Sequence, residues 1–354
     1  MNTHNSYPPL KILAKPWKQN HPPNRVLAIR LHALGDVVIT LPYLQQLKNS
    51  LPDSSKLDLL TRKETDDIPK SILLFNKIYS IGGGRNYKKQ LLYSSLLLPT
   101  LFSNRYDVII DLQNNSVSKF FRKILMPQAW SEFDRFSPIP AGDRSRFTIE
   151  AAGFGKCDAD TNLTLKNAEE RIDLLKKNGW DADNDLVILN PAGAFETRNW
   201  PIDNYVIFAK GWLQQFPKTQ FMIMGLEAIS AKADYLKTQL DDKLINLVDK
   251  TTTSQAFAIV QLAKFVLSED SGLMHMAWVS GIPTFAMFGS TRSDWARPSG
   301  EHTSFLDSSD LECGNCMKQH CKYGDTHCLT RYTAEFVFEK AILLVNKFQK
   351  EHSS

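Results

Sequence analysis

The chain has 354 residues, of which 43% are hydrophobic and 23% charged, and this much apolar material excludes a wholly disordered protein. At about 100–200 residues per domain, the length predicts two domains. The net charge of +4 conceals an asymmetry: residues 1–157 contain 22 Lys and Arg against 12 Asp and Glu, or +10, and the remainder carries −6. The basic half is expected to meet an anionic partner such as a nucleic acid, a phosphorylated sugar or a membrane surface, unless its charges only form a solvated face.

The first 24 residues are predicted to be a flexible leader. Pro16, Pro22 and Pro23 interrupt the continuous apolar stretch that a signal peptide requires. The longest apolar run, residues 91–102, falls short of the ~20 residues that span a bilayer. We therefore expect a cytoplasmic protein.

Short apolar runs alternate with longer amphipathic stretches, which is typical of βα units in a parallel sheet. The predicted fold class is α/β. Strands are predicted in the first half at 25–31, 56–60 and 107–112, and in the second half at 186–190, 221–225, 265–268 and 284–289. Helices are predicted at 41–50, 168–177, 203–216, 230–240, 254–263 and 333–348. The polar segment 158–185, which contains the helix-stop pair Asn178-Gly179, is the expected domain junction.

Leu34-Gly35-Asp36 follows the first strand and places a carboxylate at the carboxyl edge of the sheet, where ligands bind in open α/β folds. Asp36 is a candidate catalytic base, and helix N-capping is its alternative role. The chain has no GxGxxG or GxxxxGK[ST] motif, which disfavours a dinucleotide dehydrogenase and a P-loop enzyme.

Two further loops follow strands in the second half. In residues 190–201 (NPAGAFETRNWP), Gly193 and Ala194 leave room for a ligand, and the Arg198 guanidinium suits a diphosphate, although it is equally compatible with a surface residue. Residues 269–275 (EDSGLMH) open a helix whose hydroxyl, carboxylate and backbone N–H groups suit sugar and phosphate binding. The alternative there is a simple N-cap.

Four of the five cysteines form the pattern Cys313-x2-Cys316-x4-Cys321-x6-Cys328, with His320 and His327 among them. These are the ligand types of a structural zinc site in a reducing compartment. The alternative is a set of unliganded thiols that are packed or open to oxidation. A disulfide framework across the whole chain is not expected.

Together these segments resemble glycosyltransferase family 9, the lipopolysaccharide heptosyltransferases. The resemblance lies in the order and spacing of residues 25–42, 190–201, 269–277, 281–291 and 313–328. It implies a GT-B fold, in which two Rossmann-like domains face each other across a cleft. The implied divisions are the leader at 1–24, an acceptor-binding domain at 25–165, a linker at 166–185, a nucleotide-sugar-binding domain at 186–332, and a helix at 333–350 that packs back on the N-terminal domain.

The resemblance also implies an inverting, metal-independent transfer of a sugar to a lipopolysaccharide core or related surface glycan. Heptose from ADP-heptose is the family default. Asp36 matches the base of the family's LGD motif, and Arg198 stands where the family usually has Lys to stabilise the leaving nucleoside diphosphate. The implied donor-binding residues are Gly193, Ala194, Arg198, Glu227, Asp270, Ser271, Gly272, Leu273 and His275. No cofactor is required, and a zinc ion at the four cysteines would be structural only.

Three departures from the family pattern leave the donor sugar open. They are Asn190 in place of the usual His, Gly289-Ser290-Thr291 in place of the usual Gly-Pro-Thr, and His32 in place of the common Ser.

An anionic lipopolysaccharide-type acceptor at the inner face of the cytoplasmic membrane fits the basic half. The candidate acceptor-binding residues are Arg62, Lys63, Lys119, Arg122 and Arg144. The basic residues around Phe120-Phe121 predict either a contact with an anionic membrane or a buried helix face with solvated lysines.

Two other functions remain open. A zinc-knuckle protein would bind nucleic acid through the basic half. A GT-B nucleotide-sugar epimerase would act on the donor without a glycan acceptor. If the chain is a glycosyltransferase, we expect no nucleic-acid partner.

Overall fold

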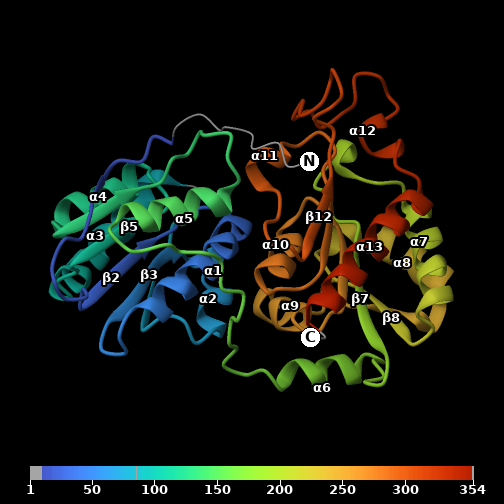
Figure 1. Cartoon of the computed structure of the whole chain (residues 1–354), viewed down its shortest axis with the longest axis horizontal. Coiled ribbons are helices and arrows are strands. Elements are labelled where there is room, and N and C mark those ends of the chain that lie inside the picture. Colours follow the sequence, from blue (N-terminus) through green and yellow to red (C-terminus); the bar gives the residue numbers. More distant parts are fainter. Residues whose placement is uncertain (1–9, 85, 353–354) are drawn as a thin grey trace. The chain divides into compact units, whose positions relative to one another are not determined.

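The computed structural model describes residues 10–84 and 86–352 and divides the chain into two compact units, with the division between Lys166 and Asn167. Each unit contains a six-stranded sheet with helices packed against it (Figure 1). Within the described ranges, no helix is long and apolar enough to cross a membrane.

The first unit has the strand order β1-β6-β5-β2-β3-β4, in which β1 is antiparallel and the other strands are parallel. Its strands are β1 (Ala14–Lys15), β2 (Arg25–Ile29), β3 (Lys56–Arg62), β4 (Lys77–Ile81), β5 (Val108–Asp111) and β6 (Ala129–Glu132). Its helices are α1 (Leu34–Ser50), η1 (Lys63–Thr65), α2 (Asp67–Ser71), α3 (Tyr87–Ser103), α4 (Ser116–Leu125) and α5 (Ala141–Ala151).

The core of the first unit forms because the inner strands of a parallel sheet are buried on both faces. Val26 through Ile29 of β2 are fully buried. On one face, α3 and α4 cover the strands through Leu101, Val117 and Phe121. The apolar run at 91–102 is thus part of α3, a surface helix that also exposes leucine side chains.

The leader prediction is wrong for the described residues that it includes. Ala14 lies opposite Ser131 in an antiparallel pair with β6, and the Trp17 amide donates to the Ala152 carbonyl at 2.8 Å. Ala14 and Lys15 therefore form an edge strand of the sheet, and the Trp17 bond holds the chain that follows them. Residues 1–9 of the predicted leader lie outside the described residues.

The second unit has the strand order β12-β11-β10-β7-β8-β9 and is parallel throughout. Its strands are β7 (Asp185–Asn190), β8 (Thr219–Ile223), β9 (Leu244–Asn246), β10 (Phe265–Glu269), β11 (Thr284–Met287) and β12 (Thr303–Leu306). Its helices are α6 (Glu170–Lys177), η2 (Glu196–Arg198), α7 (Ile202–Gln215), η3 (Glu227–Ile229), α8 (Ser230–Leu240), η4 (Asp241–Lys243), α9 (Thr253–Val260), α10 (Gly272–Val279), α11 (Ser293–Ala296), α12 (His327–Thr330) and α13 (Ala334–His352).

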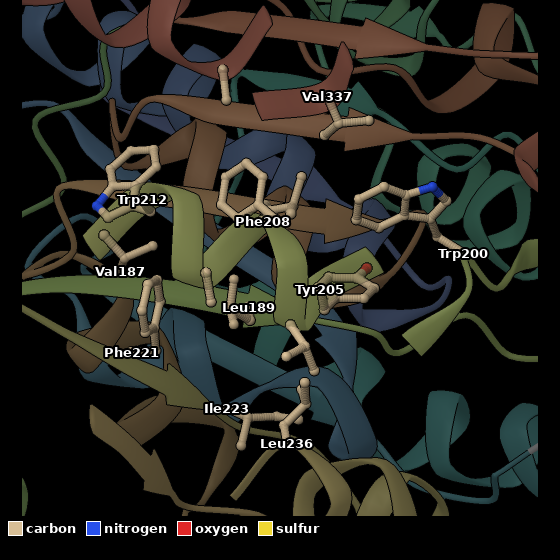
Figure 2. Close-up of a cluster of buried hydrophobic side chains, with 14 of the residues drawn as sticks. Val187, Leu189, Trp200, Tyr205, Phe208, Trp212, Phe221, Ile223, Leu236 and Val337 are labelled. Carbon is tan, nitrogen blue, oxygen red and sulfur yellow. The ribbon is translucent and has the colours of Figure 1, made fainter. Parts of the chain in front are cut away.

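An aromatic core joins the sheet of the second unit to α7 (Figure 2). The Trp212 ring stacks on Phe265 of β10 with centroids 4.9 Å apart, and Phe208 packs beside them. Trp200 is 1% exposed, and its indole N–H donates to the Tyr332 carbonyl at 2.8 Å. Trp200 therefore fixes the end of the loop that leads from β7 into α7.

The last helix packs differently from the prediction. Val337, Ala341 and Leu344 of α13 are buried in the core of the second unit, where the helix lies against α7. The apolar face is thus covered by a helix of the same unit, which corrects the expectation that it packs on the N-terminal domain. The predicted linker also contains a docked helix, α6, whose Arg171 donates to the Ala258 carbonyl of α9 at 3.0 Å.

Candidate donor site and catalytic base

The candidate donor site begins where the neighbouring parallel strands β7 and β10 end, with Asn190 opposite Ser268. The Asn190 amide nitrogen donates to the Ser268 hydroxyl at 2.7 Å and to the Ser271 hydroxyl at 2.6 Å. Ser271 is the N-cap of α10 and accepts from the Met274 amide at 3.4 Å. The loops after the two strands are thereby held together, as the fold predicts for the carboxyl edge of a sheet.

Arg198 joins three loops at this edge. Its guanidinium lies 2.9 Å from the Asp270 carboxylate and also donates to the Asp270 carbonyl. The same carboxylate accepts from the Thr291 hydroxyl at 2.7 Å. The cation is thus directed toward the N-terminus of α10, where backbone N–H groups favour a phosphate.

The two glycines of this region, Gly193 and Gly272, have different surroundings. A Cβ atom at Gly193 would lie 2.4 Å from the Arg198 carbonyl oxygen, so only glycine permits the close approach of the two loop segments. A Cβ atom at Gly272 would meet nothing within 4 Å. The start of α10 therefore has open space around the Gly272 Cβ position.

Glu269 is a positioning residue that the sequence reasoning missed. Its buried carboxylate accepts from the Gly193 amide at 2.6 Å and from the Trp200 amide at 2.7 Å, so it holds both ends of the loop that leads from β7 into α7, the candidate donor loop. Burial raises the pKa of Glu269 to about 7, although Lys232 at 4.0 Å and the two amides oppose the shift. The sequence signal that could have identified Glu269 is its position: it is the last residue of a buried strand and comes immediately before the Asp-Ser-Gly turn.

The remaining predicted donor residues lie in different environments. Ala194 is exposed and Leu273 is half-buried. Glu227 is exposed in η3, just beyond the end of β8, and its amide donates to the Asp249 carboxylate at 3.0 Å. His275 is 6% exposed, and its Nδ1 accepts from the Trp278 indole at 3.1 Å, which directs this ring nitrogen into the unit.

Asp36 belongs to the first unit and lies in the first turn of α1, because this helix begins at Leu34, earlier than predicted. Ala33 is the N-cap and makes no side-chain cap bond, so the N-cap role considered for Asp36 is wrong. One Asp36 oxygen lies 2.6 Å from Arg30 and the other 2.6 Å from His32 Nδ1. Arg30 is buried and His32 half exposed, so the carboxylate stands between the interior and the surface.

The candidate acceptor residues divide into two groups. Arg62, Lys63 and Lys119 are at least partly exposed. Arg122 is buried, paired with Glu132 and stacked over the Trp130 ring at 3.9 Å.

Arg144 is also buried, and donates to the Asp134 and Arg135 carbonyls at 3.1 and 2.9 Å. The expectation for Arg122 and Arg144 is therefore corrected, because both guanidinium groups hold the first unit together. Phe121 is fully buried and Lys123 is exposed, which is the buried helix face predicted as the alternative to a membrane contact.

All four clustered cysteines are free thiols, and so is Cys157, which is buried in the first unit. The segment that carries the four follows β12 and reaches the donor loop, where the Cys328 sulfur lies 3.7 Å from the Thr197 carbonyl oxygen. The cluster is thus adjacent to the loop that carries Arg198.

A cation beside a helix N-terminus at the strand ends of a parallel sheet forms a site that suits a phosphate or a diphosphate. The sequence model of glycosyltransferase family 9 (heptosyltransferase) matches residues 144–327. The chain belongs to this family. Family membership confirms the predicted activity of a glycosyltransferase and favours it over the nucleic-acid-binding and epimerase alternatives.

Three known proteins illustrate the similarity. The chain is 28% identical over 320 residues to lipooligosaccharide heptosyltransferase 2 of Campylobacter jejuni, covering 87% of this chain and 94% of that protein. Its structure matches a family 9 glycosyltransferase of Veillonella parvula with a TM-score of 0.76 at 17% identity, covering 92% and 97% of the two chains. It matches the Escherichia coli heptosyltransferase WaaC with ADP-2-deoxy-2-fluoro heptose with a TM-score of 0.66 at 17% identity, covering 90% and 99%. The predicted GT-B fold is confirmed.

Proposed function

We propose that this chain transfers heptose from ADP-heptose to a lipopolysaccharide core or a related surface glycan. The observation that carries the proposal is the junction of Arg198, Asp270 and the α10 N-terminus at the open edge of the second sheet. The name of the Campylobacter relative supports heptose as the sugar, and the ligand named with the Escherichia coli enzyme supports an ADP-linked donor.

The second unit supplies the donor site in this proposal. Arg198 and the first N–H groups of α10 bind the diphosphate, and Glu227 binds a ribose hydroxyl of the nucleoside. As the bond between the anomeric carbon and the diphosphate breaks, its electron pair leaves with the nucleoside diphosphate. The positive end of α10 and the Arg198 cation stabilise that growing negative charge.

The first unit supplies the base. The acceptor hydroxyl loses its proton to Asp36 while its oxygen attacks the anomeric carbon from the side opposite the diphosphate, which inverts the configuration. Arg30 holds one oxygen of the carboxylate, and His32 Nδ1 lies 2.6 Å from the other. The negative charge that develops on the diphosphate has protein partners, so we propose that transfer needs no metal ion and that zinc at the cysteines would act on structure alone.

An acceptor anchored in lipid requires the enzyme to reach a membrane surface, and α3 supports peripheral binding at the inner face of the cytoplasmic membrane. Leu92 and Leu96, one turn apart on this helix, are 60% and 67% exposed. Lys88 lies one turn before them and is also exposed. An apolar stripe beside cations suits the interface of an anionic bilayer. Arg62 and Lys63 remain candidate contacts for acidic groups of the acceptor.

A binding panel tests the donor proposal. Purified protein is titrated with ADP, UDP and GDP while its melting temperature is recorded, because a ligand that binds only the folded state raises this temperature. We expect the largest rise with ADP. Stabilisation by UDP or GDP but not by ADP would contradict the proposed donor.

A further inference from the structure

One lysine of α8 ties together both ends of the candidate donor loop, residues 190–201. The Lys232 ammonium donates to the Pro191 carbonyl at 2.7 Å and to the Asn199 side-chain oxygen at 2.5 Å. Pro191 directly follows β7, and Asn199 lies two residues before Pro201, the N-cap of α7. The lysine side chain is 29% exposed, so these bonds form in a partly desolvated place. Transfer as proposed above assigns this lysine no part.

The same lysine faces the Glu269 carboxylate. Its ammonium lies 4.0 Å from the Glu269 oxygen that accepts from the Gly193 amide. The Glu269 side chain is fully buried, and a buried carboxylate is costly unless a cation and hydrogen-bond donors compensate it. Two amides and one ammonium supply that compensation here. The loop is therefore held between an anion that accepts from its amides and a cation that donates to its oxygens.

The charges of these two groups depend on each other. Burial raises the pKa of Glu269 to about 7, and the Lys232 charge opposes that rise. Burial lowers the pKa of Lys232, and the Glu269 charge opposes that fall. The Tyr205 hydroxyl of α7 also faces Glu269, but burial raises its pKa, so it stays neutral. Removing the lysine charge should therefore let Glu269 take up a proton at a higher pH.

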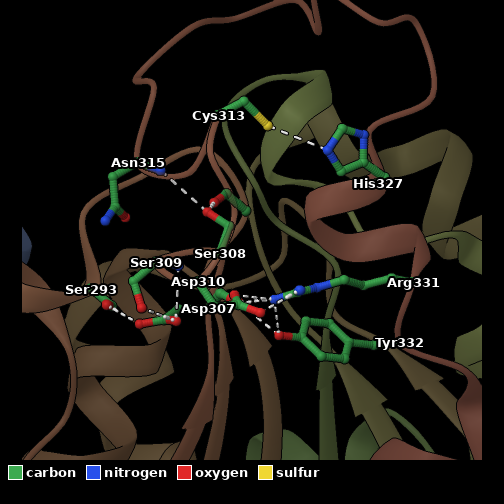
Figure 3. A network of polar contacts seen from close by, with 11 residues as sticks. Ser293, Asp307, Ser308, Ser309, Asp310, Cys313, Asn315, His327, Arg331 and Tyr332 are labelled. Carbon is green, nitrogen blue, oxygen red and sulfur yellow. Dashed lines mark hydrogen bonds and ion pairs between the residues drawn. The ribbon is translucent and has the colours of Figure 1, made fainter.

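A second tied cation in this unit shows what is particular about Lys232. The Arg331 side chain is 26% exposed and pairs with the Asp310 carboxylate at 2.6 Å (Figure 3). Its guanidinium also donates to the Asp307 carbonyl at 2.8 Å. Both partners belong to one segment after β12, and the Asp310 side chain is mostly exposed. Lys232 differs because its partners include a fully buried carboxylate and both ends of a loop at the candidate site.

The contacts of this pair lead to Arg198. Gly193, whose amide Glu269 holds, lies so near the Arg198 carbonyl that a Cβ atom would be 2.4 Å from its oxygen. We propose that Lys232 is a positioning residue for the donor: its charge compensates the Glu269 carboxylate, and its hydrogen bonds fix the loop that carries Arg198. This proposal rests on the proposed function, in which Arg198 binds the diphosphate. Protonation of Glu269 would weaken its hold on the loop, because an ionised carboxylate accepts the stronger hydrogen bonds.

Calorimetric titration of ADP into the full-length protein, from about pH 6 to 9, tests the proposal. Lys232→Gln keeps a hydrogen-bond donor but removes the charge, so the pKa of Glu269 should rise from about 7 to about 8. At about pH 7.5 the ionised fraction of Glu269 then falls from about three quarters to about one quarter, and ADP should bind about threefold more weakly. The two affinities should converge near pH 9, where both proteins hold Glu269 ionised.

Lys237→Gln is the matched control. This lysine lies on the same helix, but its ammonium donates to the Asp241 and Leu244 carbonyls at 2.7 and 2.9 Å, so the variant should bind ADP as the wild type does at every pH. Lys232→Arg keeps the charge and should restore the wild-type pH dependence. An affinity ratio between Lys232→Gln and the wild type that is the same at every pH, or no difference at all, would overturn the proposal.

Urea titrations of the same proteins need no ADP, so they separate this proposal from the proposed function. With its raised pKa, Glu269 holds a proton in the folded protein that the unfolded chain releases, and the free energy of unfolding falls until the pH passes the folded pKa. This fall should end at about pH 7 in the wild type and at about pH 8 in Lys232→Gln. Falls that end at the same pH would refute the compensation of Glu269 by Lys232. If they differ but the wild type binds no ADP, the proposed donor is wrong and the coupling of the two groups stands.

Discussion

Replacing Arg198 by alanine should weaken ADP binding more than any other single change in the second unit. Only 16% of this side chain is exposed, so its charge acts in a partly desolvated site. A hydrogen bond to a charged group contributes about 1.5–3 kcal/mol, and its loss alone weakens binding about 10- to 150-fold. Asp270 then loses its cation, keeps the Thr291 hydroxyl as a partner, and repels the diphosphate.

Isothermal titration calorimetry with ADP measures this change. Arg198→Lys should recover most of the affinity, since lysine restores the charge and is the residue usual in the family. Arg171→Ala is the control, because its guanidinium is bonded to the Ala258 carbonyl at 3.0 Å and anchors α6. If Arg198→Ala folds normally and binds ADP as the wild type does, the arginine has no part in diphosphate binding.

Three further changes test other parts of the molecule. Asp36→Asn should lower turnover by about 10²–10⁴-fold with nearly unchanged ADP affinity, and a wild-type rate would remove Asp36 as the base. The pKa of Glu269 is raised from 4.5 to about 7, so the folded protein holds a proton there that the unfolded chain has released. Its contribution to the free energy of unfolding should therefore fall as the pH rises from about 4.5 to 7. Urea titrations should show a flatter pH dependence for Glu269→Gln, and identical slopes would refute the assignment. Leu92→Glu combined with Leu96→Glu should reduce the fraction of protein that sediments with anionic vesicles. Leu73→Glu, at another exposed leucine, should not reduce it. An equal reduction in both variants would mean that α3 has no specific role in membrane binding.

The meeting of the candidate donor loops could be predicted from the sequence because each loop is a local feature. Strand ends, a small-residue loop and an N-capped helix each lie within about a dozen residues, and parallel strands bring their carboxyl ends to one edge. Asn190, Arg198 and Ser271 meet there as this geometry requires. Glu269 escaped notice because its partners, the Gly193 and Trp200 amides, are about 70 residues away along the chain.

The errors arose where long-range packing decides a residue's surroundings. A sequence does not reveal that Arg122 pairs with Glu132, or that Arg144 donates to carbonyls of another loop. Both therefore seemed available to an anionic acceptor. The apolar face of α13 required a partner, but periodicity cannot say which helix covers it, and α7 of its own unit does.

The central claim is that this chain transfers heptose from ADP-heptose with Asp36 as the base. The most direct measurement incubates the full-length protein with ADP-heptose and a heptose-deficient lipopolysaccharide core, and follows the acceptor by mass spectrometry while ADP is assayed. We predict one added heptosyl unit per ADP released, and formation of both products about 10²–10⁴-fold more slowly with Asp36→Asn. ADP release without a change in acceptor mass, or transfer by Asp36→Asn at the wild-type rate, would contradict the claim.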